Sequence, residues 1–390
     1  MQRISQFVLS KLSRITSHGG FLPEIDGLRF VAIMSVIIYH LHDYWIKKPV
    51  VARYEEGLGR FIEVLALQGW FGVQLFFVIS GFILTLPFAA HHLEGRPAVG
   101  IKSYFLRRLT RLEPTYLINL LLIFTLLIVV NHASFLGLLP NLGASAIYQH
   151  GLLFGTMSTV NFVTWSLEVE VQFYILMPFF SLVFLVKTHW IRVLLLVPAM
   201  LFFAFVEKHK LVSGFCLLSH LQYFFAGILL ADIYLTTLKN CQAALSWTWD
   251  FVAATSWILI VFILVRAEAF TLILPFLIII AYVGAFRGRL MNRIFRSPWI
   301  VTIGGMCYTI YLYHFYIISL IGHGINRFFY GCQPMVAFVA YSLIVIPAII
   351  GIGAILFILF ERPFMNKAWP KEFWLSATRQ LHFRDRRGRG

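Results

Sequence analysis

The chain has 390 residues, of which 59% are hydrophobic and 13% are charged, and its mean hydropathy is +0.81. This balance excludes an ordinary soluble domain, in which about a quarter of the residues are charged, and indicates a polytopic membrane protein. The formal net charge of +15 does not indicate nucleic-acid binding, because Lys and Arg in such a protein mostly report its topology.

Apolar runs of about 20 residues predict membrane-spanning helices. The stretch 133–155, which is rich in Gly and Leu, could hold an additional re-entrant or interfacial segment. The predicted fold class is therefore all-α, a polytopic membrane helical bundle of about ten transmembrane helices. In chain order the helices are predicted over residues 28–46, 64–86, 114–131, 161–186, 190–206, 214–235, 251–265, 269–286, 300–321 and 335–360.

Lys and Arg favour the cytoplasmic side of a membrane. With the N-terminus inside, 24 of the 32 Lys and Arg residues fall in cytoplasmic segments and eight in outer loops. Both termini are therefore predicted to be cytoplasmic.

Three segments are predicted from this pattern. They are a cytoplasmic N-terminal segment, 1–27, a transmembrane domain, 28–364, and a basic cytoplasmic tail, 365–390. The tail either contacts anionic lipids or is simply solvated. The four cysteines lack metal-binding spacing and are predicted to be unpaired, and no metal site is expected. They are Cys216, Cys241, Cys307 and Cys332.

The first predicted helix carries two ionisable residues eleven positions apart, Arg29 and His40. At ~1.5 Å per residue they are separated by roughly 16 Å along the axis and share one face. Ionisable groups inside a bilayer usually face a bundle interior or a cavity, which favours a functional site.

Depth predicts which polar groups meet. His40, the start of the 161–186 helix and His314 in the ninth helix all fall in the outer half of the membrane. Glu168 and Glu170 differ by about 200° around their helix, so only one can face a given cavity. We expect one of them to pair with His40, since a carboxylate fixes the tautomer of a histidine that acts as a general base. The other would be hydrogen-bonded within the bundle or face the outer interface.

A second polar layer is cationic and is predicted at the cytoplasmic end. Arg107, Arg108 and Arg111 precede the third helix. Arginines bind phosphate through paired hydrogen bonds, which suits a phosphate site. The preference of basic residues for cytoplasmic loops is the alternative explanation.

Six motifs in order resemble those of the acyltransferase 3 family of integral-membrane O-acyltransferases. The resemblance spans residues 24 to 364. The motifs are Asp26-Gly27-Leu28-Arg29 through His40, Gly72 through Phe82, Arg107 through Pro114, Trp165-Ser166-Leu167 through Tyr174, Tyr308 through His314, and Glu361-Arg362-Pro363.

This resemblance implies transfer of an acyl group, usually acetyl, from cytoplasmic acyl-CoA to a hydroxyl, typically on a glycan at the outer face of a bacterial inner membrane. Acyl-CoA would be a co-substrate, and no permanently bound cofactor is expected. His40 matches the essential histidine of the family and Arg29 its essential arginine, while the arginine cluster would hold the CoA phosphates. The supporting residues would be Asp26, Trp165, Ser166, Tyr308, His314, Glu361 and Arg362.

Some positions depart from the family pattern. Gln74 stands where an acid is common, Val171 replaces a second acid, and Cys307 replaces a common serine. Glu170 keeps the matching acid, so it is predicted as the catalytic carboxylate rather than Glu168. The alternative function is a proton-coupled transporter that uses the intramembrane His and Glu residues as a relay, although the sequence shows no inverted repeat.

Overall fold

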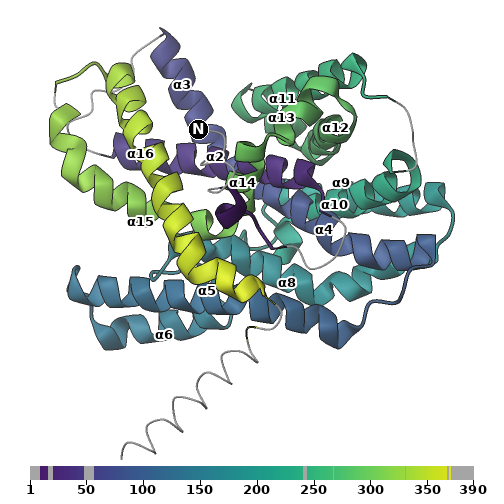
Figure 1. The fold of residues 1–390 in the computed structure, drawn as a ribbon, viewed down its shortest axis with the longest axis horizontal. Coiled ribbons are helices and arrows are strands. Elements are labelled where there is room, and N and C mark those ends of the chain that lie inside the picture. The colour runs from purple at the N-terminus through teal and green to yellow at the C-terminus, as the bar shows by residue number, and fades with distance from the viewer. Residues whose placement is uncertain are drawn as a thin grey trace, which may run out of the picture.

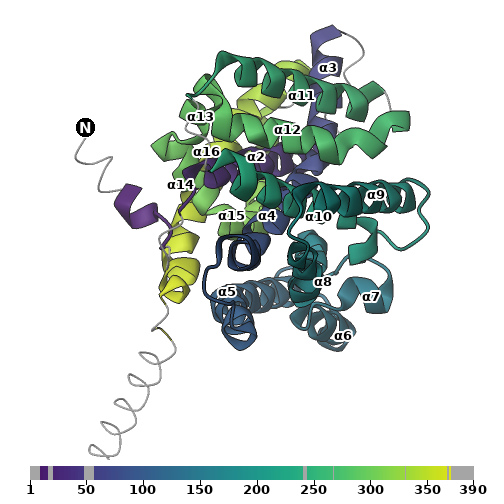
Figure 2. The ribbon, with the colours of Figure 1, turned by 90° about the vertical axis from the view of Figure 1, so that its right-hand side faces the viewer.

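The computed structural model of the chain describes residues 9–15, 21–47, 57–239, 244–266, 268–329, 331–366 and 369. These residues form a helical bundle without strands (Figures 1 and 2). Among them, nine helical segments are long and apolar enough to cross a membrane, and a bent pair of helices makes a tenth. The all-α membrane fold is confirmed.

All ten predicted helices are present in the predicted order. Most extend beyond the apolar runs, because polar residues continue a helix after its hydrophobic stretch ends. The helix that carries the arginine cluster, for example, begins at Ile101 instead of residue 114. The spanning elements are α2 (Pro23–Ile46), α3 (Gly57–Leu67) continued by α4 (Gly72–Glu94), α5 (Ile101–Val129), α8 (Trp165–Phe180), α9 (His189–Lys208), α10 (Leu221–Ile233), α11 (Trp247–Arg266), α12 (Leu274–Arg287), α14 (Pro298–Gly305) with α15 (Cys307–Ile325), and α16 (Pro334–Leu356).

Three shorter helices lie between the spans. The segment expected in 133–155 forms α6 (Phe135–Ala146) and α7 (His150–Phe154), and α6 packs against α5. Both are too short to cross a membrane. The basic stretch before α14 forms α13 (Arg289–Phe295).

The helices are arranged around α2, α4 and α10. Figures 1 and 2 place α5 and α6 along one edge of the bundle and α11 and α12 along the opposite edge. Between them, α2 contacts α4, α14 and α15, while α10 contacts α4, α9 and α12. Many large apolar side chains on the outer helices are exposed, as expected where lipid replaces water. They include Trp190, Phe251, Leu320 and Leu343.

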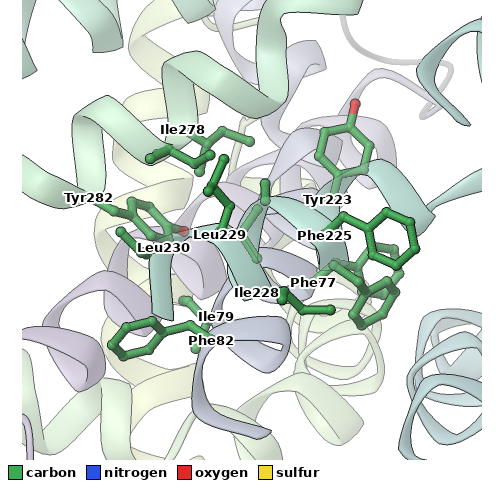
Figure 3. Packing of buried hydrophobic residues seen from close by; sticks show 14 of the residues in the cluster. Phe77, Ile79, Phe82, Tyr223, Phe225, Ile228, Leu229, Leu230, Ile278 and Tyr282 are labelled. Carbon is green, nitrogen blue, oxygen red and sulfur yellow. The ribbon is translucent and has the colours of Figure 1, made fainter. Parts of the chain in front are cut away.

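Close approach of two glycines sets the packing of α4 on α10. A Cβ atom added at Gly227 would lie 2.3 Å from the Val78 carbonyl oxygen, and one added at Gly81 would lie 2.3 Å from that of Phe224. Small residues allow this backbone contact between membrane helices. Around the crossing, apolar side chains of α4, α10 and α12 interdigitate (Figure 3).

The ninth span differs from the continuous helix predicted over 300–321. It bends by 74° at Met306, between α14 and α15. Gly304 and Gly305 precede the bend, and Gly is the weakest helix former after Pro. A Cβ on Gly304 would lie 1.8 Å from the Asp26 carbonyl oxygen, so α14 lies directly on the first turns of α2.

Two predictions fall partly outside the described residues. Cys216, Cys307 and Cys332 are free, and Cys241 lies outside. Most of the predicted basic tail, 365–390, also lies outside, including the arginines from Arg384 onward.

The α4–α10 contact gives a test of the fold. Gly227→Ala should lower stability by about 1–3 kcal/mol, because its Cβ meets backbone atoms that cannot move aside. Gly351→Ala in α16 is the matched control, since its Cβ would meet nothing within 4 Å. Thermal unfolding of the detergent-purified protein measures both. Equal melting temperatures for the two variants would contradict the packing argument.

Candidate active site

A pocket opens between α2, α4, α5, α8 and α15. Its volume is about 120 Å³, which holds several water molecules or one small chemical group. Most of the ionisable and hydroxyl side chains in its wall come from the motifs found in the sequence. The lining includes Arg14, Arg29, Arg108, Arg111, Glu170, Glu361, Ser80, Ser166, Tyr174, Cys307, Tyr308 and Tyr311.

Arg29 is held by a buried carboxylate. Its Nη1 donates to Asp26 Oδ1 at 2.5 Å, and Asp26 is 1% exposed. The two residues lie one turn apart on α2, which is the spacing at which helical side chains meet. Arg29 also lines the pocket.

The sequence did not single out Arg14. This residue precedes α2, in the described segment 9–15, and its Nη2 lies 3.5 Å from Asp26 Oδ2. Leu12, two residues earlier, is buried in the bundle and anchors the segment. Burial and the neighbouring Arg29 guanidinium lower the pKa of Arg14 to about 9. The two guanidiniums share one carboxylate, so a bound anion would stabilise them.

Two of the three arginines in the predicted cluster reach the pocket. Arg108 and Arg111 line the pocket, whereas Arg107 is exposed and the structure does not bring it there. Arg107 and Arg108 face different directions because consecutive residues of an α-helix are rotated by about 100°. The Arg108 guanidinium lies 5.7 Å from the ring centroids of Tyr104 and Tyr174. Within the described residues, neither Arg108 nor Arg111 has a carboxylate oxygen within 4 Å of its guanidinium.

Glu170 lies in the pocket but does not pair with His40, which corrects the prediction. Its Oε1 accepts hydrogen bonds from the hydroxyls of Ser80 and Tyr174. The ring of Phe162, eight residues before Glu170, contacts the His40 ring. At ~1.5 Å per residue Glu170 therefore lies roughly 12 Å away along the helix, at the level of Arg29.

Glu168 faces away from the pocket. It is 1% exposed, and its Oε2 accepts a hydrogen bond from the Gly151 backbone N–H at 2.8 Å. The prediction that only one of the two glutamates can face the cavity is confirmed, and Glu168 is the one bonded within the bundle.

His40 and His314 meet at a separate level. Their ring centroids are 5.1 Å apart, and Phe162 and Phe315 lie 5.4 and 5.7 Å from the His40 ring. The predicted convergence of three helices at one depth is confirmed for α2, α15 and the turn that precedes α8. Neither histidine lines the pocket.

Tyr311 stands between the two levels. Its hydroxyl is bonded to Ser166 Oγ at 2.7 Å and to the Val163 carbonyl oxygen. Its own carbonyl oxygen lies 2.7 Å from His314 Nδ1. Tyr311 thus closes the pocket on one side and holds a histidine on the other.

The remaining predicted residues mostly support the helices. Glu361 Oε2 accepts from Thr309 N and Oγ1 at 3.2 and 2.5 Å, which caps the start of α15. Tyr308 lines the pocket and donates to the Leu112 carbonyl. Trp165 contacts His220 outside the pocket lining, and Arg362 also lies outside it. Among the described residues, no three His, Cys, Asp or Glu side chains are grouped so that they could hold a metal ion.

Several known proteins are similar to this chain in sequence. A Staphylococcus aureus (strain COL) protein named as a candidate O-acetyltransferase is 25% identical over 332 residues, which cover 77% of this chain and 51% of the relative. Peptidoglycan O-acetyltransferase OatA of Listeria monocytogenes is 30% identical over 189 residues, 44% of this chain and 25% of its own. O-acetyltransferase OatA of Staphylococcus aureus (strain NCTC 8325 / PS 47) is 26% identical over 167 residues, 40% and 24% of the two chains.

The chain thus spans about half the length of the first of these relatives. No solved structure matches it. A family model described as an acyltransferase domain matches residues 22–360, which is most of the chain. The resemblance seen in the six motifs is confirmed, and the chain belongs to the acyltransferase 3 family.

Proposed function

We propose that the chain transfers an acyl group, most simply acetyl, from cytoplasmic acyl-CoA to a hydroxyl of a glycan at the outer side of the membrane. One observation carries this proposal: an arginine-lined pocket and a pair of histidines lie at two levels along the same helices, α2 and α15. The names of the O-acetyltransferase relatives support acetyl as the group and a glycan as the acceptor.

The donor would bind at the pocket. Among the described residues no carboxylate lies within ion-pair distance of Arg108 or Arg111, and Arg14 shares Asp26 with Arg29. Guanidiniums bind phosphate oxygens through paired, charge-assisted hydrogen bonds. A volume of about 120 Å³ is too small for a nucleotide. The nucleotide of CoA would therefore stay at the mouth, and the arm would point towards Tyr311.

The acceptor would react beside His40. The histidine removes the proton from the acceptor hydroxyl, and the oxygen attacks the thioester carbonyl. The C–S bond breaks, and the proton leaves with the thiol of CoA. A transient acyl group on His40 is the alternative covalent route. In both routes Tyr311 must move aside or the arm must pass it, because His40 is not part of the pocket wall.

The same proposal fixes the orientation. The positive-inside preference places the arginine level at the cytoplasm, where acyl-CoA is made. The histidine level then lies towards the outside, where a glycan is available.

Broken helices at a binding site also occur in carriers, usually as a matched pair. The described residues contain one such helix pair, α14 with α15. This favours the enzyme over the proton-coupled transporter. Uptake of a sugar by vesicles without covalent transfer of label from acyl-CoA would favour the transporter instead.

Removal of His40 tests the chemistry. His40→Ala should lower acyl transfer by about 10²- to 10⁴-fold, the contribution typical of a general base. The measurement is transfer of label from acetyl-CoA to glycan in membrane vesicles. His323→Ala, an exposed histidine on α15, should keep full activity. Normal turnover by a folded His40→Ala protein would remove the catalytic role.

The arginines test the donor site. Arg108→Ala and Arg111→Ala should each raise the KM for acetyl-CoA by about 10-fold or more, because a hydrogen bond to a charged group contributes roughly 1.5–3 kcal/mol. Arg107→Ala is the matched control, since it removes the same charge from the exposed face of the same helix. If all three variants have the same donor KM, the pocket does not bind the phosphates.

A further inference from the structure

Two enclosed nitrogen atoms at the histidine level have no hydrogen-bond partner. They are His40 Nδ1 and His314 Nε2. Buried polar atoms are almost always hydrogen-bonded, so exceptions of this kind call for an explanation. Both atoms belong to the pair of rings whose centroids are 5.1 Å apart.

The tautomer of His314 follows from its other nitrogen. Nδ1 lies 2.7 Å from the Tyr311 carbonyl oxygen. A carbonyl oxygen only accepts, so Nδ1 must carry the hydrogen. A neutral imidazole has a single N–H, which leaves Nε2 of His314 as an acceptor with a free lone pair. His314 is 0% exposed, so solvent does not supply a donor to it.

His40 requires such an acceptor. If Nε2 of His40 is to remove a proton, its hydrogen must be on Nδ1, and that N–H is enclosed. The other rings around His40 are those of Tyr39, Phe162 and Phe315. No hydrogen bond joins any of them to His40 Nδ1.

The two glutamates of which one is predicted to pair with His40 both form hydrogen bonds to other groups. Glu170 is bonded to Ser80 and Tyr174 in the pocket, and Glu168 is bonded to Gly151. Nε2 of His314 is an enclosed acceptor without a partner in the described residues, on a ring whose centroid lies 5.1 Å from that of His40.

We propose that His314 is a positioning residue that accepts the hydrogen of His40 Nδ1 and thereby holds His40 in the tautomer that presents Nε2 to the acceptor hydroxyl. This inference rests on the proposed acyl transfer.

The proton balance of the reaction is simple. His40 Nε2 takes the hydroxyl proton, the oxygen forms the ester bond, and the C–S bond of the thioester breaks. His40 Nε2 then returns the proton to the thiolate of CoA. His314 gains and loses no proton, and it stabilises the imidazolium through the shared hydrogen on Nδ1.

A purely structural role of His314 predicts something different. In that case the important contact is the one from Nδ1 to the Tyr311 carbonyl, which ties the side chain to its own helix. The two roles use different nitrogen atoms, and amide side chains can separate them. Asn places its amide near the position of Nδ1, and Gln places its amide near that of Nε2.

The experiment compares His314→Gln with His314→Asn in membrane vesicles that contain the full chain. With acetyl-CoA as the donor, loss of the thioester counts transfer to glycan and to water together. We expect His314→Asn to lower kcat by about 10- to 100-fold, less than loss of the base itself, with the KM for acetyl-CoA unchanged because the arginine pocket is intact. His314→Gln keeps an acceptor facing His40 and should retain activity within a few-fold of the parent.

Several outcomes would overturn the proposal. They are an active His314→Asn with an inactive His314→Gln, equal activities of the two, or a change in donor KM instead of kcat. Thermal unfolding of both purified variants checks that a loss of rate is not a loss of fold, and His323→Gln on the same helix is the control. If the parent chain has no activity above the His40→Ala background, the acyl-transfer proposal itself fails. A parent with clear activity and an indifferent His314 removes the positioning role alone.

Discussion

A buried carboxylate, that of Asp26, organises the site. The carboxylate accepts a hydrogen bond from Arg29 and lies near Arg14. The main-chain carbonyl oxygen of the same residue is the atom that Gly304 approaches. A buried ion pair contributes little net stability, but leaving one partner without the other is costly. Arg29 is therefore fixed in direction, and α14 is fixed against α2. The bend that follows α14 directs the start of α15 towards the pocket.

Helix geometry also sets the distance between the arginine level and the histidine level. Arg29 and His40 are eleven residues apart on α2, and Cys307 and His314 are seven apart on α15. At ~1.5 Å per residue these spacings are roughly 16 and 10 Å. The two helices thus lead from the arginine level to the histidine level, and Tyr311 lies between. In the proposed mechanism, a donor held by its phosphates would extend its thioester past this side chain.

The sequence predicted the parts of this arrangement that depend on regular helices. Apolar run length located all ten spans, and counting residues along them placed His40 beside His314. Depth counting failed for Glu170, because residues 161 to 170 were treated as one level although they extend over more than two turns of helix. Arg14 was missed since nothing in the local sequence says where a segment outside the spans will fold. The bend at Met306 follows two glycines that the apolar run hides, because the hydropathy of the stretch stays high through Gly304 and Gly305.

There is a physical reason why the charged pocket and the pair of histidines lie at different levels. The pocket lining has four guanidiniums and two carboxylates, and a charge in an apolar medium is costly unless it is paired. In the proposed complex, the phosphate groups of the donor would supply negative charge at that level. At the histidine level no such anion is expected, so a carboxylate beside His40 would need a compensating cation there. In the proposed mechanism, a neutral imidazole whose tautomer is fixed by the Tyr311 carbonyl would give His40 an acceptor without adding a charge. This would account for a pair of histidines without the glutamate that is also predicted at this depth.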